Sequence, residues 1–281
     1  MNDRIDLHTH STASDGTYTP SDLVHYAKTK SLRALALTDH DCIDGLKEAM
    51  AAGKEIGVEV IPGVELSAKF QNGTMHILGF FVNPTDPIFL QRLVTLQEAR
   101  RQRNPKIVQK LQDLGVKITY DEVVAASGGG QVGRPHFACV LLKKGYVKTI
   151  AEAFEKYLRD GGPAYVEKER FSPEESIALI HEAEGVAVLA HPLTLHLPVG
   201  ELDPLLERLV KAGLDGVEVY YGIHTPEQTA QYERLTRKWG LVPTGGSDFH
   251  GEYKPKIDLG VGTGDLQVPY SILEELKQRK K

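Results

Sequence analysis

The sequence predicts an α/β protein built on a parallel sheet or barrel that is interrupted by a helical insertion. Short apolar or β-branched runs alternate with longer amphipathic stretches over much of the chain, which is the pattern of repeated βα units. The alternation lapses between residues 86 and 165, where helical patterns follow one another. A length of 281 residues suits either two domains or one α/β barrel, so length alone does not choose between them.

Seven apolar runs are expected as strands, and helices are expected between them. The runs occupy residues 4–8, 34–38, 58–62, 75–82, 186–190, 216–219 and 241–245. A Ser or Thr directly before a proline marks three of the helix starts, because the hydroxyl caps the first turn and proline suits the next position. These pairs are Thr19-Pro20, Ser172-Pro173 and Thr225-Pro226.

Four helical patterns fill the interruption, at residues 88–114, 120–126, 135–144 and 149–159. We therefore expect one barrel, made of residues 1–85 and 166–281, with residues 86–165 as an inserted helical lid over the substrate. The first inserted helix carries a local concentration of basic residues: Arg92, Arg100, Arg101, Arg103, Lys106 and Lys110. A solvated helix face is the expected reason for that concentration.

Composition narrows the class of protein. With 41% hydrophobic and 25% charged residues, the chain has the usage of an ordinary globular protein. Its 33 basic and 38 acidic residues leave no basic surplus, so a stable complex with long nucleic acid is not expected, whereas small or short substrates stay open. Two distant cysteines, Cys42 and Cys139, and the lack of a long apolar run favour a cytoplasmic protein without a disulfide framework or a membrane span.

Histidine is the unusual feature of the composition, with 11 residues against 2 cysteines. His8 and His10 end the first expected strand, where alternation places them on one side, close enough to share a metal ion. Similar groups follow later runs: His40 between Asp39 and Asp41, Glu65, His191, and Asp248 with His250, while His76 lies inside the fourth run. The carboxyl ends of barrel strands are where sites assemble. For His76 the alternative is a hydrogen-bonded core histidine.

Such a ligand set predicts hydrolysis of a phosphate ester by a metal centre. Nitrogen and oxygen ligands without thiolate suit Zn²⁺, Mn²⁺ or Fe²⁺. About nine converging ligands can hold roughly two or three divalent ions, with a carboxylate such as Glu65 bridging a pair. In such sites one ion lowers the pKa of a bound water, so that hydroxide attacks phosphorus in line while neighbouring ions neutralise the phosphoryl oxygens.

Five motifs in this order resemble those of the polymerase and histidinol phosphatase (PHP) family. They are Asp6-Leu7-His8-Thr9-His10-Ser11, Thr38-Asp39-His40-Asp41, Pro62-Gly63-Val64-Glu65, Ala190-His191-Pro192 and Gly246-Ser247-Asp248-Phe249-His250. The resemblance spans residues 6 to 250. It implies a distorted (β/α)7 barrel of the amidohydrolase-like kind, with a trinuclear metal cleft and phosphoesterase activity.

The resemblance also implies a ligand set. It assigns His8, His10, Glu65 and Asp248 to one ion, Glu65, His76 and His191 to a second, and Asp15, His40 and His250 to a third. Asp248 and His191 are expected to take part in catalysis as well. Asp39 and Asp41 are expected to orient His40 through its other ring nitrogen, or else to cap the following helix.

Within the insertion, Gly133-Arg134-Pro135-His136 resembles a motif of an insertion-bearing subgroup of this family that acts on nucleotides and short RNA. Arg134 is expected to grip phosphate in a bidentate fork, and His136 to bind phosphate or protonate the leaving group. The alternative is an ordinary helix start with a solvated Arg134. His224 follows another strand and is expected at the substrate phosphate, with surface exposure as its alternative.

Aromatic residues and the remaining histidines have simpler expectations. Tyr220 and Tyr221 end a strand and are expected to pack, with stacking on a nucleobase as the alternative. His25, His181 and His196 are expected to be structural.

The function expected from these observations is a metal-dependent phosphatase that removes a phosphate from a nucleotide, with adenosine 3′,5′-bisphosphate as the leading substrate. The alternative is a 5′ to 3′ exoribonuclease on short RNA, favoured if the basic face of the first inserted helix lines a channel. Histidinol phosphatase, or an inactive metal-binding module that serves a polymerase, ranks lower. The expected cofactors are roughly two or three ions of Mn, Zn or Fe.

Overall fold

Eight strands curl into a nearly closed barrel in the computed structural model, which describes residues 3–71, 73–198 and 200–280. Their order across the sheet is β7-β6-β5-β4-β3-β2-β1-β8. The strands are β1 (Arg4–Thr9), β2 (Ala34–Leu37), β3 (Glu59–Ala68), β4 (Met75–Phe80), β5 (Val186–Leu189), β6 (Gly216–Tyr221), β7 (Val242–Gly246) and β8 (Val268–Pro269). All seven predicted runs are strands, and β8 is too short to be recognised in the sequence.

The sheet is not uniformly parallel, which corrects the sequence prediction at β4. Strands β1 to β3 are parallel to one another, as are β5 to β7, but β4 is antiparallel to both β3 and β5. The link between β3 and β4, residues 69–74, is too short for a parallel crossover, which needs about a dozen residues. The two strands therefore form a hairpin.

β1 and β7 approach each other closely and nearly close the barrel. The backbone N–H of Asp248 donates to the carbonyl of His8 over 2.8 Å, and that of His10 donates to Phe249 over 3.0 Å. A Cβ atom on Gly246 would lie 2.4 Å from the Cβ of His8. Only glycine fits at this position, and its absence of a side chain brings the two strands of ligand residues together.

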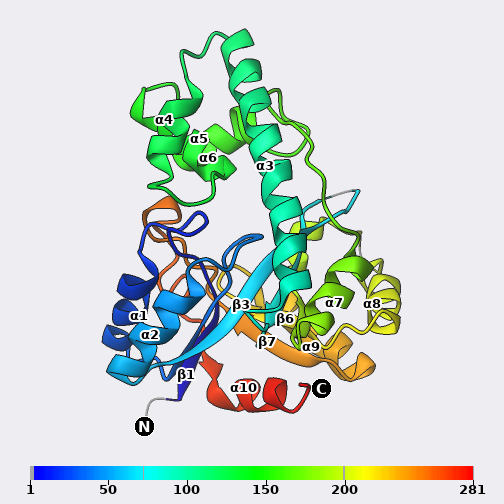
Figure 1. The fold of residues 1–281 in the computed structure, drawn as a ribbon. Coiled ribbons are helices and arrows are strands. Elements are labelled where there is room, and N and C mark those ends of the chain that lie inside the picture. Colours follow the sequence, from blue (N-terminus) through cyan, green and yellow to red (C-terminus); the bar gives the residue numbers. More distant parts are fainter. Residues whose placement is uncertain (1–2, 72, 199, 281) are drawn as a thin grey trace.

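Helices surround the barrel and close one of its ends (Figure 1). They are α1 (Pro20–Thr29), α2 (Leu46–Ile56), α7 (Pro173–Glu182), α8 (Leu202–Lys211), α9 (Pro226–Trp239) and α10 (Tyr270–Lys277). Thr19, Ser172 and Thr225 cap α1, α7 and α9 as predicted. Alternate strand residues and α10 share an interior apolar cluster that includes Ile5, Leu7, Ala34, Ile61, Leu78, Phe80, Val188, Val242 and Leu273.

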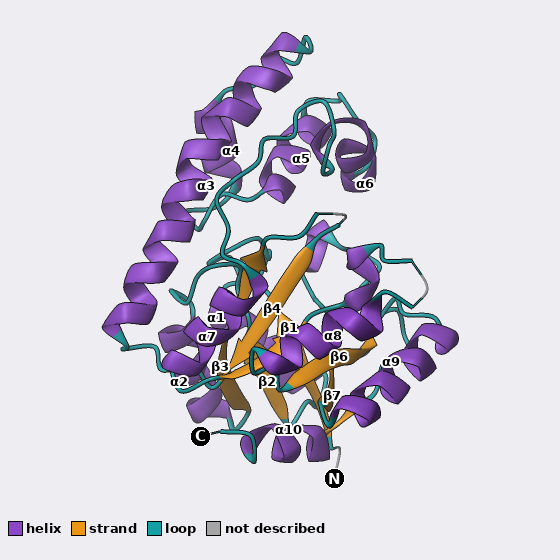
Figure 2. Ribbon diagram, turned by 90° about the vertical axis from the view of Figure 1, so that its right-hand side faces the viewer, coloured by secondary structure: helices purple, strands orange, loops and turns teal. Residues whose placement is uncertain are grey.

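The inserted helices lie at the opposite end of the barrel from α10 (Figure 2). They are α3 (Pro87–Asp113), α4 (Tyr120–Ala126), α5 (Arg134–Lys143), α6 (Ile150–Ala153) and the π-helix η1 (Phe154–Leu158). The helix α3 joins two cores. Its first half packs on the barrel through Phe89, Leu93 and Leu96, and its second half packs in a separate cluster of the insertion through Ile107, Val108 and Leu111. No described helix is long and apolar enough to cross a membrane.

Candidate metal centre

The nine residues predicted as metal ligands lie together at the barrel end that faces the insertion. They are His8, His10, Asp15, His40, Glu65, His76, His191, Asp248 and His250. Most follow the carboxyl ends of parallel strands. His76 instead begins the antiparallel strand β4, opposite Ser67 of β3, so the start of β4 comes to the same end of the barrel.

Three groups within this cluster have ligand atoms within 4.8 Å of one another. They are His8 with His10, Glu65 and Asp248; His10 with Asp15, His40 and His250; and His40 with Glu65 and His76. His191 joins the last of these through its Nε2, which is 3.3 Å from His76 Nδ1. The side chains of His10, His40 and Glu65 each belong to two groups.

Glu65 lies at the centre of the cluster and is 1% exposed. Its Oε2 is 3.2 Å from His8 Nε2, 3.2 Å from His10 Nε2 and 3.0 Å from His40 Nδ1. Its Oε1 is 2.6 Å from His76 Nδ1 and 3.0 Å from His191 Nε2. A carboxylate reached from both sides in this way has the geometry of a bridging ligand.

Four buried atoms of the cluster have no hydrogen-bond partner among the described residues: His8 Nε2, His10 Nε2, His40 Nδ1 and Glu65 Oε2. Such atoms are costly to bury unless something satisfies them. All four point into the centre, and the donor set is imidazole and carboxylate. The residues present therefore fit divalent metal ions of the Mn, Fe and Zn series.

Glu218 on β6 holds two of these histidines, and the sequence reasoning missed it. His8 Nδ1 lies 2.9 Å from Glu218 Oε1, and the backbone N–H of His191 donates to Oε2 over 2.7 Å. The carboxylate is fully buried. Its contact with Nδ1 leaves His8 Nε2 free to face Glu65, which is how a carboxylate fixes the orientation of a metal-binding histidine. The sequence feature that could have revealed Glu218 is the single acidic residue inside the apolar run 216–219.

Asp248 is held by two further residues that the sequence reasoning did not place at the site. The hydroxyl of Tyr221 donates to Asp248 Oδ2 over 2.7 Å, and Lys254 Nζ lies 2.5 Å from the same oxygen. Burial would raise the pKa of Asp248, but the charges of Lys254 and His250 outweigh it and hold the pKa well below its usual range. The carboxylate is therefore ionised and ready to bind a cation.

Neither Asp39 nor Asp41 contacts the ring of His40, so that expectation is wrong. Asp39 accepts hydrogen bonds from the backbone N–H and hydroxyl of Ser11 and from the hydroxyl of Ser14. Asp41 instead faces the insertion, where it binds Arg100 at 2.6 Å. Nor does either residue cap a helix, because α2 begins after Gly45 without a side-chain cap.

The basic face predicted on α3 is only partly solvated, which corrects a further expectation. Arg101 is exposed, but Arg100 and Arg103 are 7% and 6% exposed. Both face the junction between α3 and the barrel rather than solvent. The sequence does not distinguish these two arginines from their exposed neighbours, because their partners come from distant segments.

Arg134 and His136, which were expected to bind substrate, are held by contacts within the insertion. Arg134 forms an ion pair with Asp160 inside the insertion and donates to the carbonyl of Leu158 over 3.1 Å. His136 is buried, and its Nδ1 accepts from the backbone N–H of Gly133 over 2.9 Å. Burial lowers the pKa of His136, although the charge of Asp15 opposes that effect. His136 therefore lies within electrostatic reach of the cluster.

His224 lies beside Tyr221 at the rim of the site. Its Nδ1 donates to the carbonyl of Val219 over 2.9 Å, and its Nε2 is buried without a partner among the described residues. The rings of His224 and Tyr221 are 5.0 Å apart between centroids. Tyr221 therefore links His224 to Asp248.

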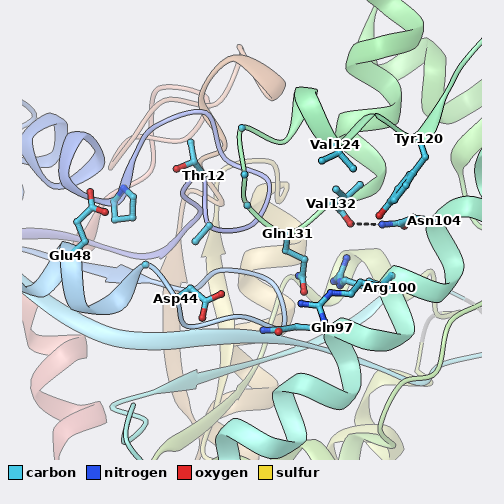
Figure 3. Close-up of a pocket in the computed structure, with 17 residues that line it drawn as sticks. Thr12, Asp44, Glu48, Gln97, Arg100, Asn104, Tyr120, Val124, Gln131 and Val132 are labelled. Carbon is cyan, nitrogen blue, oxygen red and sulfur yellow. Dashed lines mark hydrogen bonds between the residues drawn. The ribbon is translucent and has the colours of Figure 1, made fainter. Parts of the chain in front are cut away.

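A cavity of about 720 Å³ adjoins the cluster without containing any of its nine residues. It lies between α3 and α4 on one side and the loops after β1 and β2 on the other (Figure 3). Gln131 stands between the cavity and the cluster, since it lines the cavity and its amide donates to the carbonyl of His40 over 2.6 Å. Tyr120, Asn104 and Arg100 line the insertion side.

A barrel that gathers nine histidines and carboxylates at one end, beneath inserted helices, has the architecture of a metal-dependent hydrolase. The chain belongs to the PHP-domain family, whose profile matches residues 6–170. It is a metal-dependent phosphoesterase, and the predictions of this family, of the α/β barrel and of this class of enzyme are confirmed.

Relatives with two different names resemble the chain over nearly its whole length. It is 36% identical over 250 residues to a 5′-3′ exoribonuclease from Haemophilus influenzae, covering 89% of this chain and 91% of that one. It is 35% identical over 284 residues to a 3′,5′-nucleoside bisphosphate phosphatase from Chromobacterium violaceum, covering 98% and 97%. A crystal structure from Bifidobacterium adolescentis, described as a candidate metal-dependent phosphoesterase, superposes with a TM-score of 0.89 at 31% identity, covering 99% and 96%.

Proposed function

We propose that this enzyme hydrolyses the phosphate monoester of a nucleotide, with a nucleoside 3′,5′-bisphosphate as its substrate. The observation that carries the proposal is the buried cluster around Glu65, whose unpartnered atoms face a common centre beneath the insertion. The substrate class is supported by the 35% identity, over 98% of this chain, to a relative named 3′,5′-nucleoside bisphosphate phosphatase.

The ligand groups support roughly two or three ions of Mn, Zn or Fe. In this proposal His8, His10, Glu65 and Asp248 hold one ion, Glu65, His76 and His191 hold a second, and Asp15, His40 and His250 hold a third. Ions in such a centre supply a nucleophile at neutral pH and neutralise charge on the phosphoryl group. Glu65 is the one ligand that this assignment gives to two ions, in keeping with its place between the groups.

The remaining site residues bind and orient. Glu218 keeps His8 and His191 facing the centre, and Tyr221 and Lys254 keep Asp248 ionised and fixed in place. In this proposal His136 meets the leaving group or a phosphoryl oxygen, and the influence of the Asp15 charge on its pKa supports that role. In this proposal His224 meets the substrate phosphate beside Tyr221, whose ring it contacts.

Residues 86–165 act in this proposal as a lid. They carry their own apolar cluster, and α3 ties them to the barrel. Arg134 begins α5 on the lid, where Asp160 fixes its guanidinium. Its contribution to phosphate binding then depends on a substrate oxygen that competes with, or shares, this ion pair.

A second candidate function is 5′ to 3′ exoribonuclease activity on short RNA. The cavity beside the centre favours it, because Tyr120 and Arg101 offer an aromatic ring and a cation to nucleotides that continue past the scissile bond. The 36% identity to a relative named 5′-3′ exoribonuclease supports it as well.

A substrate panel tests both functions. We expect phosphate release from adenosine 3′,5′-bisphosphate to exceed release from 5′-AMP and from histidinol phosphate, and mononucleotide release from 5′-phosphorylated RNA to measure the second activity. The variant His8→Ala with His10→Ala should lose all activity, while His25→Ala, which changes an exposed histidine of α1, should keep it. Preference for histidinol phosphate, or full activity of the double variant, contradicts the proposal.

A further inference from the structure

The glycine-rich segment before α5 is docked on two barrel loops that carry metal ligands. The backbone N–H of Gln131 donates to the carbonyl of Ala13 over 3.0 Å, and the side-chain amide of Gln131 donates to the carbonyl of His40 over 2.6 Å. A Cβ atom on Gly130 would lie 1.8 Å from the carbonyl oxygen of Thr12, so only glycine allows this close approach. The segment is therefore held by the loop after β1 and by the loop after β2.

A third barrel loop reaches the same region through one side chain, Tyr253. This residue ends the short helix η3 (Gly251–Tyr253), which follows the ligand His250 and lies beneath α4 in Figure 1. The hydroxyl of Tyr253 donates to the carbonyl of Ala126, at the end of α4, over 3.3 Å. Its ring meets the ring of His136 edge to face, with the two centroids 5.7 Å apart. Tyr253 therefore joins the loop after β7 to both α4 and α5.

The three docking loops carry the ligands of a single group. Each loop supplies one ligand to the group that His10 completes, and these ligands are Asp15, His40 and His250. Asp15 also lies against the docked segment, because a Cβ atom on Gly133 would lie 3.4 Å from Asp15 Oδ2. The insertion is thus fastened to the barrel at the place where this ligand group assembles.

His136 lies between these docking contacts, in the first turn of α5, and is 1% exposed. Its Nδ1 accepts from the backbone N–H of Gly133 over 2.9 Å, so Nε2 is the ring nitrogen that this bond leaves for a substrate. Aromatic rings in contact adopt preferred relative orientations, among them the edge-to-face arrangement. The contact with Tyr253 therefore sets the direction in which Nε2 of His136 points.

We propose that Tyr253 is a positioning residue, which orients the ring of His136 toward the substrate from the loop that carries the ligand His250. This inference rests on the proposed function, in which His136 meets the leaving group or a phosphoryl oxygen. Burial raises the pKa of the Tyr253 hydroxyl to about 12, so at neutral pH the hydroxyl is protonated and donates to Ala126. Because Gln131 holds the start of α5 from the other side, loss of the Tyr253 ring frees the ring of His136 without releasing the insertion.

A double-mutant cycle between Tyr253 and His136 tests this role, with activity expressed per metal-loaded chain. Tyr253→Ala should lower kcat/KM for adenosine 3′,5′-bisphosphate by about 10- to 100-fold, since a misplacement of about 1 Å can cost about 100-fold. In the His136→Asn background the same change should lower kcat/KM by less than about 2-fold, because Tyr253 acts through His136. A purely structural role predicts the same loss in both backgrounds, and that result overturns the inference.

Tyr253→Phe separates the ring of Tyr253 from its hydroxyl. The phenyl ring keeps the edge-to-face contact, so kcat/KM should stay within about 3-fold of the wild type. Tyr146→Phe is the matched control, because it removes a tyrosine hydroxyl that accepts from the backbone N–H of Lys117 in another part of the insertion. It should leave kcat/KM unchanged. A loss in Tyr253→Phe as large as that in Tyr253→Ala overturns the inference.

A spectrum of the zinc-loaded protein without substrate separates this inference from the proposed function. The ring protons of His136 are assigned by NMR from their absence in His136→Asn. Their signals should move in Tyr253→Ala and stay in place in Tyr253→Phe, because the neighbouring aromatic ring shifts them. If no substrate of the panel is hydrolysed but the signals follow this pattern, the proposed function fails and the placement of His136 by Tyr253 stands. If the panel behaves as expected but the double-mutant cycle is additive, the inference fails alone.

Discussion

Two buried carboxylates organise the charges of this molecule in different ways. Glu65 is surrounded by imidazoles, whose unshared nitrogens make a site for metal cations. Asp41 is surrounded by Arg100 and Lys168, whose positive charges neutralise it. A third buried carboxylate, Glu218, differs from both Glu65 and Asp41. It acts on the metal centre only through the histidines that it orients.

Replacing Glu218 by Gln should weaken metal binding without removing a ligand. The amide keeps the shape of the side chain but loses the charge that orients His8, so we expect the metal affinity to fall by about 10- to 100-fold. Competition with a chromogenic chelator measures this change. Glu233→Gln is the control, since Glu233 accepts from Tyr220 and does not touch the cluster. Unaltered affinity in a folded Glu218→Gln protein would show that the contact is not needed.

Lys168 should make the stability depend on pH above neutrality. Its pKa is about 7 in the folded protein against an ordinary value of 10.5, so between these values the unfolded chain binds more protons. The free energy of unfolding of the wild type should therefore rise from pH 7 to pH 9 relative to Lys168→Met, by up to about 1.4 kcal/mol per pH unit. Urea denaturation of both proteins in phosphate-free buffer measures the difference. Parallel pH profiles would contradict the low pKa of Lys168.

Two arrangements of strands shape the metal centre. They are the hairpin of β3 and β4 and the contact of β1 with β7. The hairpin turns β4 around, so that His76 joins the ligands from the start of a strand instead of its end. The contact of β1 with β7 brings His8 and His10 to Asp248 and His250, and Gly246 makes that approach possible.

Gly246→Ala should therefore destabilise the barrel and the metal centre together. The added Cβ would lie 2.4 Å from the Cβ of His8 and force β1 away from β7. We expect a loss of about 2 kcal/mol in the free energy of unfolding, and a lower metal content, by denaturation and elemental analysis. Thr244→Val on the same strand is the matched control, because the Thr244 hydroxyl has no described partner. Equal stability of Gly246→Ala and wild type would exclude this role for Gly246.

Local patterns predict the strands and the capped helices because each depends on neighbours in the sequence. The ligand residues are also predictable, since they recur at the same end of one strand after another. The direction of β4 is not predictable from periodicity, because side chains alternate between the two faces of the sheet in parallel and antiparallel strands alike. Three residues are missed for another reason: Glu218, Lys254 and Lys168. None of them belongs to a repeated pattern in the sequence, and each can be recognised only from the partner that it contacts in the folded chain.

At the scale of the whole molecule, the metal centre lies between two apolar cores that one helix connects. α3 packs on the barrel with its first half and on the insertion with its second half. Arg100 and Arg103 lie between these halves and face the junction. The insertion therefore brings buried cations close to the metal-ligand cluster of the barrel.

Reconstitution of metal-free protein tests the central claim most directly. Chelated and dialysed protein is titrated with Mn²⁺, and phosphate release from adenosine 3′,5′-bisphosphate is recorded against bound ions per chain. We predict no turnover without metal and full turnover at roughly two or three ions per chain. Full turnover by the metal-free chain, or none by a chain that has bound its ions, would contradict the account.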